Sequence, residues 1–152
     1  MNNMANKETA GLVLRPPADA AEWRAIHALR RRALFDDSPD YDENHPDDRD
    51  PDHRLLALFI DGRLLGTVRV DLSHPAWAAF RLVAIDPQRR GHGYGTEMLK
   101  LAENFIKEKG WRQVRLHAKP EAAGFYKRCG YHAVTWEEAA RMPECVDMGK
   151  HL

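Results

Sequence analysis

The chain has 152 residues, of which 43% are hydrophobic, enough to bury the core of one domain but not of two ordinary domains. Basic residues (Lys and Arg) and acidic residues (Asp and Glu) number 23 each, so no net charge favours nucleic acid. No apolar run approaches the ~18 residues of a membrane span. The two cysteines lack a C-x-x-C spacing and no apolar leader follows Met1, so we expect a cytoplasmic protein without a disulfide framework or a membrane partner.

The start of the chain predicts a tail and then a first strand. Residues 1–10 are polar and without periodicity, so we expect a flexible tail followed by a single domain over residues 11–152. Residues 12–14 form a short apolar run that two prolines end, which suits a strand.

A helix is expected next. Asp19 can cap its N-terminus, and Glu22 follows at the spacing of a capping box. Trp23 and Ile26 fall on one face of this helix, whereas the arginines at 30–32 lie mostly off that face. We therefore expect the three arginines to form a solvated helix end.

Residues 36–52 are predicted to form an acidic loop. They carry nine acidic residues against one arginine, and three prolines oppose regular structure. Two interpretations stay open: a solvated loop without further role, or a rim whose local field attracts cationic, amine-bearing substrates.

No metal site is expected. Asp40, Asp42 and Asn44 have the spacing of the start of an EF-hand loop, but His45 stands where that loop needs glycine and Pro51 where it needs glutamate. The eight histidines are scattered, without paired Cys or His spacing.

Two apolar runs, 54–60 and 64–70, flank Asp61 and Gly62, a pair that favours a tight hairpin turn. A third strand over 77–85 would complete an antiparallel meander. In the second strand and up to Asp71, polar residues alternate with apolar ones, so one face of this strand can contribute to a cleft.

Residues 80–110 predict a strand, a glycine turn and a helix. The helix has apolar residues at helical spacing and Gly110 at the position of a C-cap. Three glycines in the turn, Gly91, Gly93 and Gly95, allow several backbone N–H groups to face one small space, where the helix dipole adds partial positive charge. This segment is therefore expected to bind phosphate.

After this helix we expect a strand over 114–117, parallel to the third strand because a helix crosses between them, and a helix from Pro120 to Gly130. Two late strands, 131–135 and 145–150, would flank a helical or looped segment, 136–142. The predicted fold class is α/β of the α+β type: a mixed, mostly antiparallel twisted sheet flanked by helices, with one parallel pair.

Two motifs resemble those of the GNAT superfamily of N-acetyltransferases. Residues 88–93 match the pattern Q/R-x-x-G-x-G/A, and residues 122–131 match A-x-x-F-Y-x-x-x-G-F/Y. The order of elements is similar over nearly the whole chain. The resemblance implies an enzyme that moves an acetyl group from acetyl-coenzyme A to a primary amine by direct attack in a ternary complex, as a monomer or a homodimer.

The resemblance also implies a coenzyme site. The backbone of the turn would hold the pyrophosphate, Val83 and Ile85 would pair with the pantetheine arm, and the parallel strands would separate to admit the thioester. The residues implied to bind the coenzyme are Val83, Ile85, Arg89, Arg90, Gly91, His92, Gly93, Tyr94, Gly95, Thr96 and Phe125. Family members often have Asn or Gln near Lys119, so a coenzyme contact there stays open.

Acetyl transfer needs a neutral nucleophile and a proton for the departing thiolate. Tyr126 is the candidate general acid, because it lies at the family's matching position and its phenol can protonate a thiolate. His117 and Asp71 are the alternative candidates for the general base or for a substrate contact.

The acceptor is expected to be a small-molecule or peptide amine, with the acidic loop favouring a cationic one. The sequence argues against a dinucleotide-binding site. The glycine turn follows an antiparallel meander instead of opening a β-α-β unit, and no acidic residue ends the next strand to bind a ribose hydroxyl. The remaining alternative is a catalytically inactive module that binds acyl-coenzyme A as a sensor or for interaction.

Overall fold

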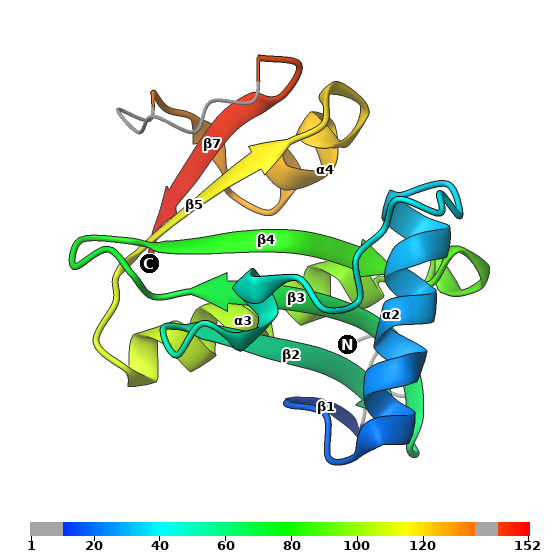
Figure 1. Ribbon diagram of the computed structural model, residues 1–152. Helices are drawn as coiled ribbons and strands as arrows, with labels where there is room; N and C mark the ends of the chain where they lie inside the picture. Colours follow the sequence, from blue (N-terminus) through cyan, green and yellow to red (C-terminus); the bar gives the residue numbers. More distant parts are fainter. Residues whose placement is uncertain (1–10, 136–142) are drawn as a thin grey trace.

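A computed structural model describes residues 11–135 and 143–152 of the chain. It contains a seven-stranded sheet in the order β1-β2-β3-β4-β5-β7-β6 (Figure 1). The expected tail, 1–10, and the expected segment 136–142 lie outside the described residues. The strands are β1 (Leu12–Arg15), β2 (His53–Ile60), β3 (Arg63–Asp71), β4 (Ala78–Ile85), β5 (Gln113–Ala118), β6 (His132–Ala133) and β7 (Val146–His151).

The antiparallel meander forms as its turn residues predict. Asp61 and Gly62 have φ of 49° and 75° and join β2 to β3. Both strands are buried over most of their length, because helices cover both faces of the sheet at this point. β1 and β4 pair antiparallel with the outer edges of β2 and β3.

β4 and β5 are the parallel pair, and they stay paired over only three positions. Ala78, Ala79 and Phe80 face Val114, Arg115 and Leu116. Beyond Phe80, β4 remains paired with β3 to Ile85, whereas β5 continues to Ala118 beside β7. Figure 1 shows the two strands diverging. The predicted fold class is confirmed, and so is the predicted direction of this pair.

A β-bulge accompanies the divergence. From the pair Arg69–Arg81 to the pair Thr67–Ala84 there are three residue steps along β4 but only two along β3, so β4 contains one extra residue. Leu82 lies in this extra step with φ of 50°, a value that non-glycine residues rarely adopt. Bulges bend and twist the strand that carries them, so this one directs the end of β4 away from β5.

The helices cover the sheet on two faces (Figure 1). The helix α2 (Ala20–Leu34) begins as predicted, with the Asp19 side chain accepting a hydrogen bond from the Glu22 backbone at 2.9 Å. The helix α3 (Tyr94–Glu108) covers the other face. The short helix α4 (Ala123–Arg128) follows a 3-10 turn, Pro120–Ala122. No helix among the described residues is both long and apolar enough to cross a membrane.

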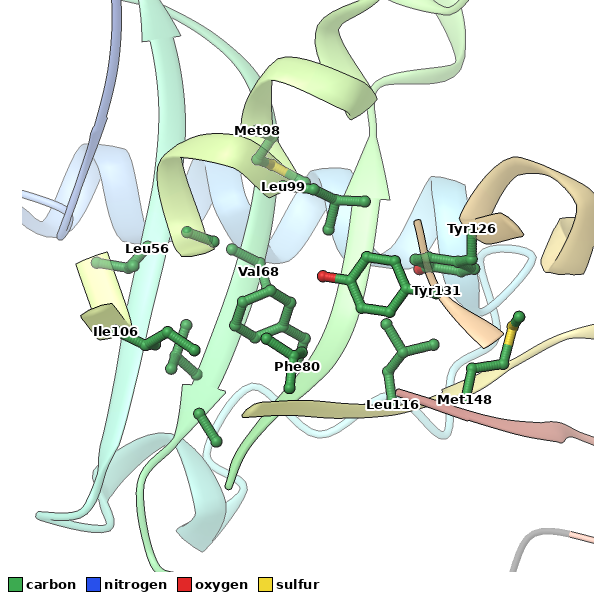
Figure 2. Packing of buried hydrophobic residues seen from close by; sticks show 14 of the residues in the cluster. Leu56, Val68, Phe80, Met98, Leu99, Ile106, Leu116, Tyr126, Tyr131 and Met148 are labelled. Atoms are coloured by element: carbon green, nitrogen blue, oxygen red, sulfur yellow. The ribbon is translucent and has the colours of Figure 1, made fainter. Parts of the chain in front are cut away.

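The main core lies between α3 and the sheet. Met98, Leu99 and Ile106 recur at helical spacing and are fully buried against Val68 and Phe80. Figure 2 shows this cluster continuing to Leu116, Met148, Tyr126 and Tyr131, so β5, β7 and α4 belong to the same core. A smaller cluster under α2 contains Ile26, Leu55, Ala57 and Phe59.

Some predicted elements differ from the structure in their bounds or type. The late strand expected over 131–135 contains only His132–Ala133. The third strand of the meander begins at Ala78, one residue later than predicted. The acidic loop contains a short 3-10 helix, Pro46–Arg49, although its prolines were expected to prevent regular structure. Proline is tolerated in the first turn of a helix, because a backbone N–H at that position would have no partner within the helix.

Gly66 on β3 is predicted to tolerate no side chain. A Cβ atom there would lie 2.6 Å from Cδ1 of Ile85 and 2.7 Å from the backbone oxygen of Ala84. Gly66→Ala should therefore lower the free energy of unfolding by about 1–3 kcal/mol, measured by urea denaturation. Gly124→Ala is the matched control, because its Cβ would meet Arg128 at an ordinary 3.6 Å. Equal stability of the two variants would contradict the prediction.

Candidate active site

The glycine turn before α3 has the geometry of an anion site. Gly91 and Gly93 have φ of 85° and 78°, and a Cβ atom at either would meet no heavy atom within 4 Å, so the space beside them is open. Gly93 is the N-cap residue of α3, and in the part of the chain that the structure describes no side chain caps the first turn. The first N–H groups of a 15-residue helix are therefore available to an anion.

The other residues predicted for this site surround the turn. Arg89 ends a 3-10 helix, Pro87–Arg89, that leads into it, and Arg90 follows. Phe125 of α4 packs on the start of α3, where a Cβ at Gly95 would lie 3.1 Å from its ring. Gly95 therefore allows α4 to approach the helix N-terminus closely.

A cavity of about 480 Å³ lies where β4 and β5 separate. Val83 lines it from β4, and His117 lines it from β5. Tyr126 of α4 and Lys119 line it as well, and residues of α2 and the acidic loop complete the wall. Two predicted catalytic residues, His117 and Tyr126, thus share one cavity with Val83.

Tyr126 is 7% exposed. Its ring makes edge contacts with Phe125 and Tyr131, at centroid distances of 5.2 and 5.8 Å. Burial raises the pKa of Tyr126 to about 12, with a smaller effect from Cys129. Because the phenol stays protonated at neutral pH, it can donate a proton.

His117 is held by a carboxylate that the sequence reasoning missed. Its Nδ1 lies 2.7 Å from Oδ1 of Asp147, and the two residues face each other across β5 and β7. When Nδ1 carries the proton and donates it to Asp147, Nε2 is the nitrogen that can accept one. The pair lies 30 residues apart in sequence, and only the register of two strands brings it together.

Asp71 has a different environment from that of His117. It is not among the residues that line the cavity. Its carboxylate accepts hydrogen bonds from Nε and Nη2 of Arg69 at 2.7 and 2.9 Å, and it lies 3.4 Å from Arg81 and 3.6 Å from His53. Asp71 thus holds Arg69, which does line the cavity.

The prediction that the arginines at 30–32 are all solvated is wrong for Arg30. Arg30 is 1% exposed, and its Nη1 donates to both carboxylate oxygens of Asp48 at 2.9 and 3.1 Å. The i, i+4 spacing places Arg30 on the same face as the buried Ile26, but an arginine is normally solvated unless an acidic partner is buried with it. That partner comes from the acidic loop, which helical periodicity cannot reveal.

The acidic loop forms part of the cavity wall. Asp40, Asp42, Asp47 and Asp48 all line the cavity, which favours the second interpretation of the loop as a rim. Asp48 is neutralised by Arg30, and Asp47 lies 3.7 Å from Arg69. Among the described residues, neither Asp40 nor Asp42 forms an ion pair with a basic side chain.

In residues 11–135 and 143–152, no group of three or more His, Cys, Asp or Glu side chains could hold a metal ion.

Comparison with known proteins identifies the family. Residues 21–131 match the model of the acetyltransferase (GNAT) family, so the chain belongs to that family. A curated relative, the uncharacterized protein YyaT of Bacillus subtilis (strain 168), is 28% identical over 82 residues, which are 54% of this chain and 55% of the relative. The match thus spans about half the length of that relative.

Solved structures show the same fold. An aminoglycoside 6′-N-acetyltransferase complexed with coenzyme A is similar with a TM-score of 0.76 and 13% identity, over 91% of this chain and 96% of that chain. A spermidine N-acetyltransferase from Vibrio cholerae, in complex with coenzyme A and spermine, is similar with a TM-score of 0.71 and 19% identity, over 93% and 96%.

The raised pKa of Tyr126 predicts a loss of stability at high pH. The pKa of a tyrosine in the unfolded chain is about 10, whereas that of Tyr126 in the folded protein is about 12, so folding disfavours the phenolate. The free energy of unfolding therefore falls as the pH rises from about 10 toward about 12. Between about pH 9 and about pH 11.5, the free energy of unfolding of the wild type should fall by up to about 2 kcal/mol more than that of Tyr126→Phe. Urea denaturation at each pH measures this difference, and parallel curves would contradict it.

Proposed function

We propose that this protein moves an acetyl group from acetyl-coenzyme A to a primary amine by direct attack in a ternary complex. The observation that carries the proposal is the separation of β4 from β5, because Val83 and His117 line one cavity from the two separated strands. Membership of the acetyltransferase (GNAT) family supports the same reaction.

The residues around the glycine turn fit a coenzyme pyrophosphate. The open space at Gly91 and Gly93 suits a phosphate group, and so does the start of α3, where the N-cap residue Gly93 provides no side-chain hydrogen bond. The edge of β4 beyond Phe80 no longer pairs with β5, so Val83 and Ile85 can pair with the peptide-like pantetheine arm. The coenzyme-binding residues of the proposal are Val83, Ile85, Arg89, Arg90, Gly91, His92, Gly93, Tyr94, Gly95, Thr96 and Phe125.

Acetyl-coenzyme A supplies a thioester, whose C–S bond breaks as the amine forms a C–N bond. His117 is the proposed general base: Nε2 takes a proton from the acceptor nitrogen while Asp147 stabilises the imidazolium. Tyr126 is the proposed general acid and donates its phenolic proton to the departing thiolate sulfur. Asp71 is the weaker candidate for the base, because Arg69 already engages both of its oxygens.

A cationic acceptor fits the wall of the cavity. Asp40 and Asp42 line it without forming an ion pair among the described residues, so they can attract a second ammonium group of the acceptor. Aromatic rings, including those of Phe35 and Tyr41, line the same wall and can contact the acceptor's alkyl chain or its charge.

Thiol release from acetyl-coenzyme A tests the proposed reaction. The wild type should release thiol with at least one amine from a panel of an alkyl diamine, spermidine, an aminoglycoside, an amino acid and a peptide with a free N-terminus. Tyr126→Phe should lower kcat by about 10²-fold or more, while coenzyme affinity changes little, because the general acid acts only in the transition state. No transfer to any amine, with intact coenzyme binding, would favour the inactive module. Unchanged turnover of Tyr126→Phe would remove the acid role.

The pH dependence of turnover tests the base. A general base works only when it is unprotonated, so turnover falls at low pH and the pH–rate profile has an acid limb. His117→Gln should lower kcat by about 10²-fold and abolish that limb. Asp147→Asn should lower kcat with little change in coenzyme affinity, because an amide can favour the wrong tautomer of His117. His151→Gln, at an exposed end of β7, is the control and should leave the profile unchanged. An acid limb that persists in His117→Gln would exclude this base.

A further inference from the structure

Arg30 is a buried cation that connects α2 to the acidic loop beneath the proposed acceptor cavity. Its side chain is 1% exposed, and the Asp48 side chain that it contacts is 7% exposed. Both residues line the cavity. In residues 11–135 and 143–152, no atom accepts a hydrogen bond from Nε or Nη2 of Arg30, so the Asp48 carboxylate alone compensates the charge by close contact.

The same arginine reaches the aromatic part of the loop. Nη1 of Arg30 lies 3.4 Å from the hydroxyl of Tyr41, which lies 2.7 Å from Nδ1 of His27. Burial lowers the pKa of His27, so its neutral imidazole can accept a hydrogen bond from the Tyr41 hydroxyl. Tyr41 and Asp48, seven positions apart in the loop, are therefore both held by one guanidinium on α2.

Other contacts of the loop are weaker or reach the sheet. Asp47 lies 3.7 Å from Arg69, and its backbone oxygen accepts a hydrogen bond of 2.6 Å from Nδ1 of His53. Arg31 pairs with Glu43, but both side chains are at least one-third exposed. An exposed pair contributes little, whereas a buried charge that loses its partner is strongly unfavourable.

We infer that Arg30 is a positioning residue for the acceptor site: it holds Tyr41 and Asp48 in place, so that the acidic loop presents its carboxylates to the cavity. The cavity is the acceptor site only if the proposed function is right, and the inference rests on that function. The coenzyme side of the site does not depend on Arg30, because the glycine turn precedes α3 on another part of the fold.

Hydrogen exchange and kinetics on the full chain test this role. Arg30→Met keeps an unbranched side chain without charge, and Asp48→Asn keeps the shape of the partner and avoids a buried lone carboxylate. In both variants, backbone amides of residues 36–52 should exchange about tenfold faster or more, while those of residues 91–96 keep the wild-type rate. Arg24→Met, at an exposed position of the same helix, is the control and should exchange like the wild type.

The kinetic prediction separates acceptor binding from chemistry. With the amine that the wild type acetylates fastest, Arg30→Met should raise the KM for the amine about tenfold or more, with kcat and coenzyme affinity within about twofold. Arg30→Lys should recover part of this loss, because it keeps the charge without the planar fork.

The two measurements distinguish failure of the inference from failure of the proposed function. Wild-type exchange of residues 36–52 in both Arg30→Met and Asp48→Asn would overturn the role of Arg30. Faster exchange spread over the whole sheet would overturn it too, since it would indicate general destabilisation. If no amine is acetylated while exchange changes only in the loop, the proposed function fails and the anchoring of the loop stands.

Discussion

The interaction on which the site depends is the short parallel pairing of β4 with β5. It lasts for three positions, after which β4 stays paired with β3 and β5 stays paired with β7. The bulge at Leu82 makes this possible, because it bends β4 while preserving its ladder with β3. A sheet paired to its full length would have no open backbone edge and no cavity between Val83 and His117.

The space between the separated ends of β4 and β5 has chemically different surroundings on its coenzyme side and on its acceptor side, as proposed above. On one side, backbone N–H groups at the start of α3, which lack intrahelical partners, provide positive potential next to Arg89 and Arg90. On the other side, charged side chains such as Arg30 and Asp48 are buried in pairs. Buried ion pairs add little stability but are costly to break, so they suit a wall whose shape has to be maintained.

Much of the fold could be predicted from local sequence. Asp61 and Gly62 specify a turn by their tolerance of positive φ, and the apolar period of α3 specifies both the helix and its buried face. The glycine turn was predicted as an anion site from its backbone freedom and the dipole of the following helix, and the structure shows open space beside Gly91 and Gly93. The first of the two late strands was predicted less well than the second, because β6 pairs over only two residues and has no pattern of its own.

By itself, the sequence determined most of the segments that are helix or strand, the position of the glycine turn before α3 and the family to which the chain belongs, because these depend on residues that are close together in the chain. Only the tertiary structure decided the environment of each charged side chain. Arg30 is buried because Asp48 folds back over it, Asp147 meets His117 through strand register, and Asp71 is engaged by Arg69. Such pairings depend on where distant segments meet, and a residue's type and local period carry no information about that.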